Sequence, residues 1–366
     1  MPTKNQPARS DSLRAVLKKM PKIDLHRHLE GSLRLSTLAE IAREHGVDMQ
    51  ALDMEELRPL VQMVDDEPNF QTFLAKFTVL RKFYNTRESV MRIAYEVVAD
   101  AAHDNVKYLE LRFNPVAQAY HQGFGFEEVA DWVIEAANKA QRDFDIRVRL
   151  IVQLGRHEPQ FARRLAELAV ARKNKGIVAL DLAGDEEHYS AGKFIDVLRW
   201  AKTQGLHITA HAGECKNCGA DNVSEAIDVI NADRVGHGVQ ARGNIKVIDL
   251  LQRKKIPLEM CPTSNFQTAA IKGFSQHPLL SFYRLGIPVT INTDDPSVSN
   301  ITLTDEYLVA VKGLGVPFSA LKDMIINAAK AAFLPPDERD KLVSWFSQAL
   351  NRHTLKEQPD GSHRRN

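Results

Sequence analysis

The sequence predicts an α/β fold of the (β/α)8 class, a TIM barrel with eight parallel strands. Two observations favour it. Short apolar runs alternate with longer amphipathic stretches along most of the chain, and the runs are continuously apolar, as is typical of parallel strands buried on both faces. The chain has 366 residues and no linker or repeat, and barrels of this length commonly form a single domain.

The predicted strands are short runs rich in β-branched and other apolar residues. In chain order they are Lys22–His26, Lys107–Arg112, Arg147–Gln153, Val178–Leu182, His207–Ala210, Arg234–Gly236, Pro257–Met260 and Pro288–Asn292. Amphipathic helices are predicted between most of them, at Glu127–Arg142, Pro159–Lys173, Ala191–Thr203, Asn222–Ile230 and Asn244–Lys254. Eight strand–helix units in succession favour closure into a barrel.

Two segments are additional to a minimal barrel. An insertion after the first strand is predicted to hold helices around Thr37–His45, Met54–Pro59, Phe70–Phe83 and Arg87–Asp104. Its apolar residues could line a lid over the barrel mouth, although ordinary helix packing is the better interpretation for most of them: Leu57, Leu60, Phe70, Phe73 and Phe77. After the last strand, helices are predicted near Thr304–Lys312, Ser319–Ala332 and Pro336–Asn351.

Composition sets the domain limits and excludes several classes of partner. Residues 1–20 are predicted to form a flexible arm, 21–352 a single domain and 353–366 a flexible tail. The formal net charge of +1 argues against a surface built for nucleic acid. We find neither a membrane-spanning apolar run nor a secretory signal, so we expect a cytoplasmic protein.

Three cysteines do not form a disulfide framework. Cys215 and Cys218 make a CxxC pair, and Cys261 is the only other cysteine, so a zinc site of four cysteines is impossible within one chain. We interpret the pair as incidental thiols in a loop, in a reducing cytoplasm. A redox-active pair is the less favoured alternative.

Four polar segments follow predicted strands. Because the carboxyl ends of barrel strands meet at one rim, these segments could converge on a single ion. Their candidate residues are His26 and His28; His211 and Glu214; His237; and Asp294 and Asp295.

His26 and His28 share one face if they lie on a strand, because side chains two residues apart point the same way. Alone, such a pair is equally well explained by one buried and one exposed histidine. Histidines at the other strand ends, His211 and His237, and the carboxylate of Asp294 favour a metal site. Three neutral imidazoles and one carboxylate suit Zn²⁺, while Fe²⁺ and Mn²⁺ are less easily excluded.

The remaining acidic residues suit proton transfer and ligand contacts. Glu214 lies three residues after His211 and could move protons between water and a substrate; the alternative is a surface acid that opens a helix. Asp294 and Asp295 aim differently because they are adjacent, so one could bind metal and the other a ligand. A helix-capping role before Pro296 is compatible with that function. Phosphate loops, a serine nucleophile elbow and the cytidine-type deaminase motif are absent from the sequence.

These segments resemble the adenosine deaminase branch of the amidohydrolase superfamily. The resemblance covers Pro21 to about Ala332 and rests on five ordered motifs: DLHRHLEGSLR (Asp24–Arg34), LDLAGDE (Leu180–Glu186), HAGE (His211–Glu214), RVGHG (Arg234–Gly238) and INTDDP (Ile291–Pro296).

The resemblance implies a role for each matching residue and a purine nucleoside as substrate. One zinc ion per chain would be held by four of them: His26, His28, His211 and Asp294. Glu214 would protonate the ring nitrogen N1, and His237 would orient the attacking hydroxide. Asp295 would hydrogen-bond N7, and the backbone of Gly184 would contact the ring near N3.

One departure concerns the substrate. Family members commonly have Asp in HLDG, where the carboxylate meets the ribose 5′-hydroxyl, whereas this chain has Glu30. HLEG occurs in adenine deaminases and in several bacterial relatives. The segments Leu180–Glu186 and Cys261–Thr268 look more like those of bacterial adenosine deaminases. We therefore expect adenosine and 2′-deoxyadenosine, with adenine or a 5′-modified nucleoside (aminofutalosine or methylthioadenosine type) as the alternative.

Two further alternatives belong to other functional classes. A two-metal amidohydrolase acting on amides, esters or phosphoesters would often have a modified lysine at a middle strand end, and we find no lysine so placed. A non-enzymatic binding protein would be expected to lack one of the ligands, yet all the expected residues are present. The oligomeric state is not predicted.

Overall fold

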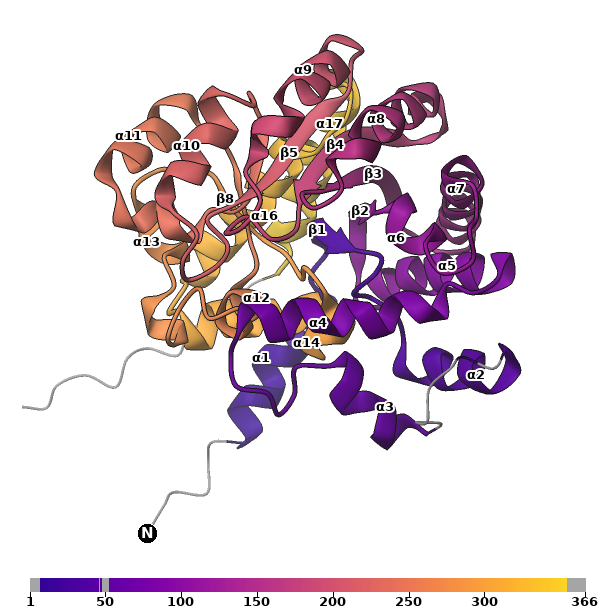
Figure 1. Ribbon diagram of the computed structural model, residues 1–366. Helices are drawn as coiled ribbons and strands as arrows, with labels where there is room; N and C mark the ends of the chain where they lie inside the picture. Colours follow the sequence, from indigo (N-terminus) through magenta and orange to yellow (C-terminus); the bar gives the residue numbers. More distant parts are fainter. Residues whose placement is uncertain (1–6, 46, 48–52, 354–366) are drawn as a thin grey trace, which may run out of the picture.

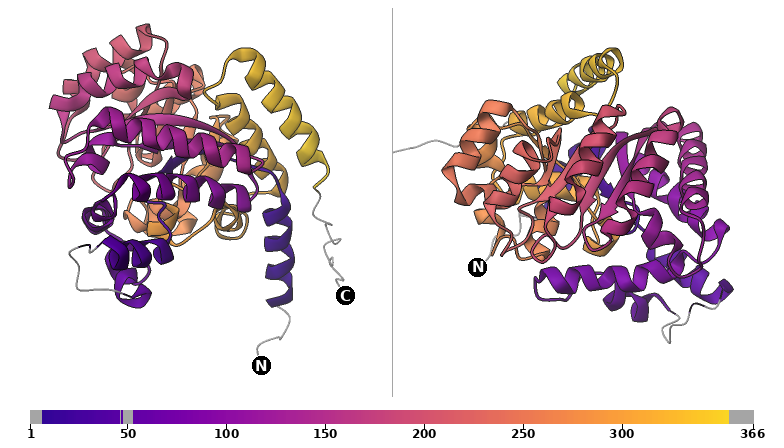
Figure 2. Two further views of the ribbon diagram at one scale, coloured as in Figure 1. Left: turned by 90° about the vertical axis from the view of Figure 1, so that its right-hand side faces the viewer. Right: turned by 45° about the horizontal axis from the view of Figure 1, so that its top comes forward.

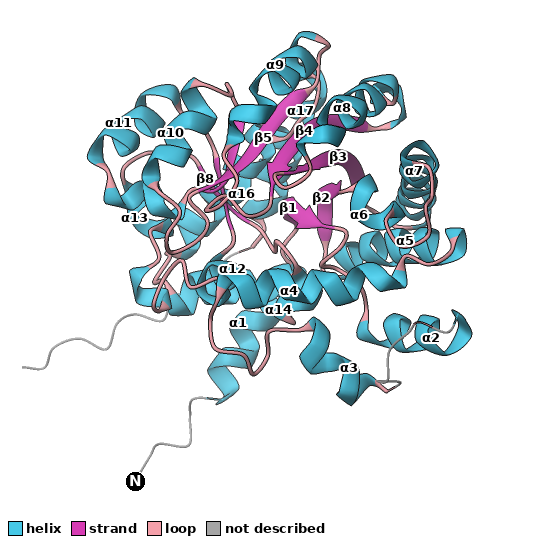
Figure 3. Ribbon diagram, viewed as in Figure 1, coloured by secondary structure: helices cyan, strands magenta, loops and turns pink. Residues whose placement is uncertain are grey.

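The computed structural model describes residues 7–45, 47 and 53–353 (Figure 1). Eight parallel strands, ordered β1 to β8 as in the sequence, form its centre. They are β1 (Lys22–His28), β2 (Val106–Phe113), β3 (Arg147–Gly155), β4 (Ile177–Ala183), β5 (His207–Ala212), β6 (Arg234–His237), β7 (Leu258–Met260) and β8 (Val289–Ile291). Figure 3 shows these strands surrounded by helices. The predicted TIM barrel is confirmed.

Contacts between the first strand and the segment after the last one bring the two ends of the sheet together. A parallel bridge joins Arg27 to Asp294. The His28 backbone N–H donates to the Asp294 carbonyl at 2.9 Å, and the Asp294 N–H donates to the His26 carbonyl at 2.8 Å. Closure therefore places Asp294 beside the two histidines of β1, although 266 residues separate Asp294 from His28.

Helices cover the outside of the barrel, as the amphipathic patterns predict. Those that follow the middle strands are α6 (Pro115–Ala119), α7 (Phe126–Asp143), α8 (Ala162–Ala171), α9 (Ile195–Thr203), α10 (Ala220–Asp228), α11 (Ile245–Lys254), α12 (Pro262–Gln267) and α13 (Leu279–Arg284). Several begin at side-chain caps; Asn114, for example, accepts hydrogen bonds from the first backbone N–H groups of α6. Their buried faces form one large core with the strands.

Four α-helices lie between β1 and β2: α2 (Leu35–His45), α3 (Met54–Val61), α4 (Phe70–Leu80) and α5 (Arg87–His103). Helix α4 crosses the front of the barrel in Figure 1. After β8 come α14 (Pro296–Ser299), α15 (Leu303–Leu308), α16 (Phe318–Ala331) and α17 (Pro336–Asn351). Figure 2 shows α17 on the outside of the molecule, packed on α16. No helix in the described part of the chain is long and apolar enough to cross a bilayer.

The predicted flexible arm at residues 1–20 is wrong for most of its length. Pro7–Lys19 form helix α1, and both Leu17 and Met20 are buried in the main core. A few apolar residues docked against the barrel are sufficient to order a segment that is polar by composition. Within the predicted tail only His353 is described; residues 354–366 lie outside the described part of the chain.

Candidate metal and catalytic site

The four predicted metal ligands meet at the carboxyl ends of β1, β5 and β8. His26 Nε2 and His28 Nε2 are 3.3 Å apart, and His28 Nε2 lies 3.2 Å from His211 Nε2. Asp294 Oδ1 is 3.1 Å from His26 Nε2 and 3.2 Å from His28 Nε2. All four side chains are buried. The alternation of His26 and His28 on one strand therefore points both imidazoles inward, as predicted.

These separations fit one small divalent cation. An ideal tetrahedron with edges of about 3.2 Å has its centre about 2.0 Å from each corner, close to the usual zinc–nitrogen and zinc–oxygen distances. Burial lowers the pKa of His211 to about 4, so its imidazole is neutral and able to coordinate metal. Burial lowers the pKa of His26 as well, but hydrogen bonds to Asp294 and Glu259 outweigh it and raise the net value. A bound cation would compete with that proton.

The other ring nitrogen of each histidine is held by an oxygen acceptor. His26 Nδ1 lies 2.8 Å from Glu259, His211 Nδ1 lies 3.0 Å from Asp181, and His28 Nδ1 lies 2.8 Å from Gln153 Oε1. Because these oxygens accept the Nδ1 proton, each Nε2 has a free lone pair that faces the others. The Arg112 guanidinium donates to Asp181 and Glu259 and ties two of the acceptors together.

No role was predicted from the sequence for these three acceptors. Glu259, Asp181 and Gln153 lie on β7, β4 and β3; the first two are fully buried, and Gln153 is partly buried. The signal that could have found them is an acidic or amide residue within an otherwise apolar parallel strand, because such a residue requires a buried partner.

Glu214 lies beside the cluster in the loop after β5. The backbone N–H groups of Gly213 and Glu214 donate to the Glu186 carboxylate at 2.9 and 2.6 Å, which fixes the loop. Burial and then the nearby negative charges of Asp294 and Glu186 raise the pKa of Glu214 well above its usual value. A raised pKa favours the protonated form of a carboxyl group, and this form can act as a general acid.

His237, at the end of β6, faces both Glu214 and the cluster. Its Nε2 lies 3.7 Å from Glu214 Oε1 and 3.9 Å from Asp294 Oδ2. His237 and Asp294 both have positive φ angles, 61° and 60°. Non-glycine residues rarely adopt this conformation, and in buried positions it is typical of functional sites.

Three buried polar atoms at this rim have no hydrogen-bond partner among the described residues: His237 Nε2, Asp294 Oδ2 and Asp295 Oδ1. Burial and then the charge of Asp294 raise the pKa of Asp295 well above its usual value. The side chain of Asp295 also explains why residue 31 is a glycine, because a Cβ atom on Gly31 would lie 1.8 Å from Asp295 Oδ1. Buried polar atoms without protein partners are expected where a ligand supplies the missing bonds.

A cavity of about 300 Å³ lies at this rim, lined among others by His28, His211, Glu214 and Asp294. The predicted substrate residues Gly184, Glu30 and Asp295 all line it, and Gly184 has a φ of 102°, which suits glycine. Glu30 accepts hydrogen bonds from the Asn114 backbone N–H at 2.7 Å and from Gln118 Nε2 at 2.9 Å. Burial raises the pKa of Glu30 to about 7.

Helix α4 supplies one wall of the cavity. Phe73 and Phe77, two of the candidate lid residues, line it, whereas Leu57 is buried in the main core and Leu60 is exposed. Phe70 packs elsewhere, against Cys215 and Cys218. Of the five candidate lid residues, Phe73 and Phe77 therefore line the cavity, and a lid function of this segment stays a prediction.

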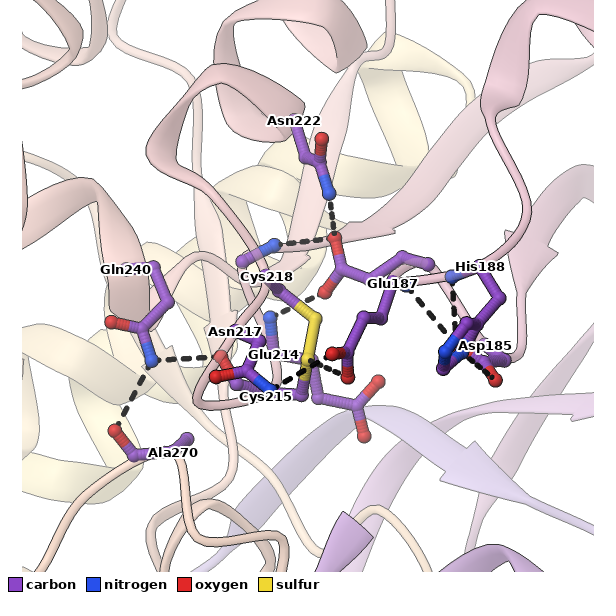
Figure 4. The surroundings of a disulfide bond; sticks show 12 residues. Asp185, Glu187, His188, Glu214, Cys215, Asn217, Cys218, Asn222, Gln240 and Ala270 are labelled. Carbon is purple, nitrogen blue, oxygen red and sulfur yellow. Dashed lines mark hydrogen bonds and ion pairs between the residues drawn. A yellow bond between two sulfur atoms is a disulfide. The ribbon is translucent and has the colours of Figure 1, made fainter. Parts of the chain in front are cut away.

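The interpretation of Cys215 and Cys218 as incidental thiols is wrong. They form a disulfide immediately after Glu214, as Figure 4 shows. The Gln240 side-chain amide donates to the Cys215 carbonyl at 2.8 Å. The three-residue spacing allows such a bond, but only the loop conformation brings the two sulfurs together. Cys261 is a buried free thiol.

Comparisons with known proteins agree with this site. Residues 21–349 match the family model described as Adenosine deaminase. An adenosine deaminase from Clostridium botulinum (strain Okra / Type B1) is 38% identical over 332 residues, which cover 90% of this chain and 98% of the relative.

Solved structures share the fold. The N6-methyl-AMP deaminase of Arabidopsis thaliana superposes with a TM-score of 0.81 at 28% identity, covering 93% of this chain and 100% of that one. An adenine deaminase from Arthrobacter aurescens has a TM-score of 0.83 at 24% identity, covering 91% of this chain and 99% of that one, and supports the fold alone.

Proposed function

Because this chain belongs to the adenosine deaminase family and is therefore a hydrolytic deaminase, we propose that its substrates are adenosine and 2′-deoxyadenosine. Water replaces the 6-amino group, and the products are inosine or deoxyinosine and ammonia. The observation that carries this proposal is the single cavity that joins the His/Asp cluster, Glu214 and a separate set of polar residues.

His26, His28, His211 and Asp294 hold one zinc ion in this proposal. Their buried nitrogen and oxygen donors and mutual distances support that choice. When bound, zinc lowers the pKa of water to about 7 and so makes hydroxide available at neutral pH.

Glu214 moves the protons. The attacking oxygen forms a bond to C6, the C6–N1 π electrons move to N1, and the Glu214 carboxyl group gives its proton to N1. The resulting carboxylate accepts a proton from the attacking oxygen and returns it to the amino group, which leaves as ammonia. The raised pKa of Glu214 supports this order, because it favours a carboxyl group that is protonated at the start.

Three other residues hold the reactants. His237 lies between Glu214 and Asp294 and orients the attacking oxygen. Asp295, whose raised pKa favours the protonated carboxyl group, donates to N7 of the purine. The backbone of Gly184 contacts the ring near N3. Asp295 and Gly184 both line the cavity, which supports these assignments.

A second set of polar residues favours a nucleoside over free adenine. Glu30, Arg81, Asn114 and His157 line the cavity but do not belong to the metal cluster. A bare base would leave them without a ligand, whereas a ribose offers several hydroxyl groups.

One observation favours the second candidate, a nucleoside modified at its 5′ position. Arg81 Nε is buried and has no hydrogen-bond partner among the described residues, and Arg81 lines the same cavity. An unpaired guanidinium donor is well suited to an added electron-rich 5′ group.

Ammonia release tests these alternatives directly. Purified zinc-loaded protein is assayed with adenosine, 2′-deoxyadenosine, adenine, 5′-methylthioadenosine and adenosine 5′-monophosphate, and kcat/KM is compared. The proposal predicts the highest values for the first two. Preference for a 5′-modified compound would select the second candidate, and preference for adenine would contradict both. An Arg81→Gln variant should reduce kcat/KM selectively for the 5′-modified compounds if the second candidate is correct.

A further inference from the structure

A chain of hydrogen bonds reaches His237 from outside the cavity. The Leu279 backbone N–H donates to His277 Nδ1 at 3.2 Å. His277 Nε2 lies 3.1 Å from Asn265 Oδ1, and Asn265 Nδ2 lies 3.1 Å from His237 Nδ1. Asn265 lies on α12, and His277 lies between α12 and α13. None of the roles assigned so far involves Asn265 or His277.

The first of these hydrogen bonds determines which group donates and which accepts in each of the others. A backbone N–H can only donate, so His277 Nδ1 must be the acceptor and carries no proton. Neutral His277 therefore carries its proton on Nε2 and donates it to Asn265 Oδ1. The amide oxygen of Asn265 then faces His277, its NH2 group faces His237, and His237 Nδ1 must accept. The proton of neutral His237 is consequently on Nε2.

Burial keeps these hydrogen bonds, and the positions of their protons, fixed. Asn265 and His237 are fully buried, and His277 is only 7% exposed. Burial, and then the charge of Arg242, lower the pKa of His277 to about 3, so it stays neutral in the folded protein. The Asn265 backbone is also fixed, since its N–H donates to the Cys261 carbonyl at 2.9 Å and its carbonyl accepts from Ile271 at 3.2 Å.

We propose that Asn265 and His277 are positioning residues that hold His237 in the tautomer whose Nε2–H points at the attacking oxygen. His237 Nε2 has no partner among the described residues, and it lies between Glu214 Oε1 and Asp294 Oδ2. In this tautomer neutral His237 donates a hydrogen bond and accepts no proton at Nε2, so the proton of the attacking oxygen goes to Glu214. The inference rests on the proposed deamination.

Asn265→Asp is the sharpest test because it changes one NH2 group to an oxygen. The new carboxylate can only accept from His237, so Nδ1 becomes protonated and neutral His237 loses its Nε2–H. We expect kcat to fall roughly tenfold to a hundredfold with a smaller change in KM, as for other residues that orient a ligating or catalytic histidine. The 15N chemical shifts of the His237 ring, measured on histidine-labelled protein, should show protonated Nε2 in the wild type and protonated Nδ1 in the variant.

His277 provides the matched pair of variants. His277→Gln keeps an amide donor near Asn265 Oδ1 and should retain most of the wild-type kcat, whereas His277→Phe removes the donor and should behave like Asn265→Asp. His207 begins β5, at the end of that strand opposite to His211. A His207→Gln variant therefore serves as a control that should leave kcat unchanged. Circular dichroism confirms that each variant is folded.

Two results would overturn the proposal. One is an unprotonated Nε2 on neutral His237 in the wild type; the other is equal kcat for His277→Gln and His277→Phe. The ring shifts can be measured without substrate, so they test the tautomer even if adenosine is not deaminated. Failure of the wild type to release ammonia from any adenine compound would instead contradict the proposed function.

Discussion

At the scale of single residues, the central feature is a buried carboxyl group beside a cluster of metal donors. Burial and then the charges of Asp294 and Glu186 raise the pKa of Glu214 well above its usual value, which favours its protonated form. Three imidazoles and Asp294 lie within bonding range of one ion. Neither part alone is sufficient for hydrolysis, because the attacking oxygen and the ring nitrogen must be activated together.

Replacing Glu214 with Gln should separate proton transfer from metal binding. Glu214→Gln keeps the shape and neutrality of the protonated carboxyl group but cannot transfer a proton. We expect unchanged zinc content and a loss of kcat of about 10²- to 10⁴-fold, measured by ammonia release and elemental analysis. Glu187→Gln, an exposed residue that does not line the cavity, is the control. Normal turnover by Glu214→Gln would show that another group moves the proton.

Asp181 should control metal affinity through His211. Its carboxylate lies 3.0 Å from His211 Nδ1 and is also bound by Arg112. We expect Asp181→Asn to weaken zinc binding roughly 10- to 100-fold, measured by competition with a fluorescent chelator on protein whose fold is verified by circular dichroism. The exposed Asp196→Asn is the matched control. Equal affinities would mean that His211 needs no carboxylate partner.

The metal-binding and proton-transfer residues could be predicted from the sequence, but the residues that hydrogen-bond to them and orient them could not. His26, His28, His211, Glu214 and Asp294 follow recognisable strand ends, and the structure brings them together. For the supporting residues, the local signal is at most a polar residue within an apolar strand, and this signal does not identify the partner, which lies elsewhere in the chain. Examples are Gln153, Asp181, Glu259, Asn265 and His277.

At the scale of elements, the strands were predicted more accurately than helix α1 and the loop that contains the disulfide. Each predicted strand lies within about two residues of the observed one at either end, because buried parallel strands need continuous apolar runs. Helix α1 was missed because only a few of its residues are apolar, and tertiary packing of Leu17 rather than composition orders it. The disulfide was missed because a CxxC pattern also fits free thiols.

The loop after β5 offers a test at this scale. Cys215 and Cys218 close a four-residue ring, and the sulfurs pack against Phe70 and Leu74 of α4. We expect the double variant Cys215→Ser/Cys218→Ser to lose about 2 kcal/mol of unfolding free energy in urea, the value that chain entropy gives for so short a ring.

Alkylation of denatured protein provides the companion measurement. Without reductant one thiol should react, that of Cys261, and after reduction all three cysteines should react. Cys261→Ser should leave none before reduction. Three reactive thiols in the unreduced, air-equilibrated wild type would contradict the observed bond.

At the scale of the whole molecule, a buried carboxyl group outside the site should make stability depend on pH. Glu306 of α15 is fully buried, and burial raises its pKa to about 8. In the unfolded chain its pKa is near 4.5. The folded state therefore binds the proton more tightly, and stability is lost as pH rises from about 4.5 to about 8.

Glu306→Gln should remove this pH dependence. One unit of pKa difference corresponds to about 1.4 kcal/mol, so Glu306 accounts for a loss of at most roughly 5 kcal/mol over that range. Urea unfolding at pH 5 and pH 8.5 should show a smaller decrease for Glu306→Gln than for the wild type. Equal decreases would mean that Glu306 titrates normally in the folded protein.

Barrel closure is what assembles the site from distant parts of the chain. Asp294 reaches the two histidines of β1 through the backbone hydrogen bonds that join the first and last strands. The same closure positions the carboxyl ends of β5 and β6, and with them His211, Glu214 and His237. We therefore propose that one metal ion binds where these strands converge.

Anomalous X-ray diffraction at the zinc edge, on crystals of protein active in ammonia release, tests that claim most directly. We predict one peak per chain, within bonding distance of His26 Nε2, His28 Nε2, His211 Nε2 and Asp294 Oδ1. An active protein whose crystals show no anomalous peak for any metal at this position would contradict it.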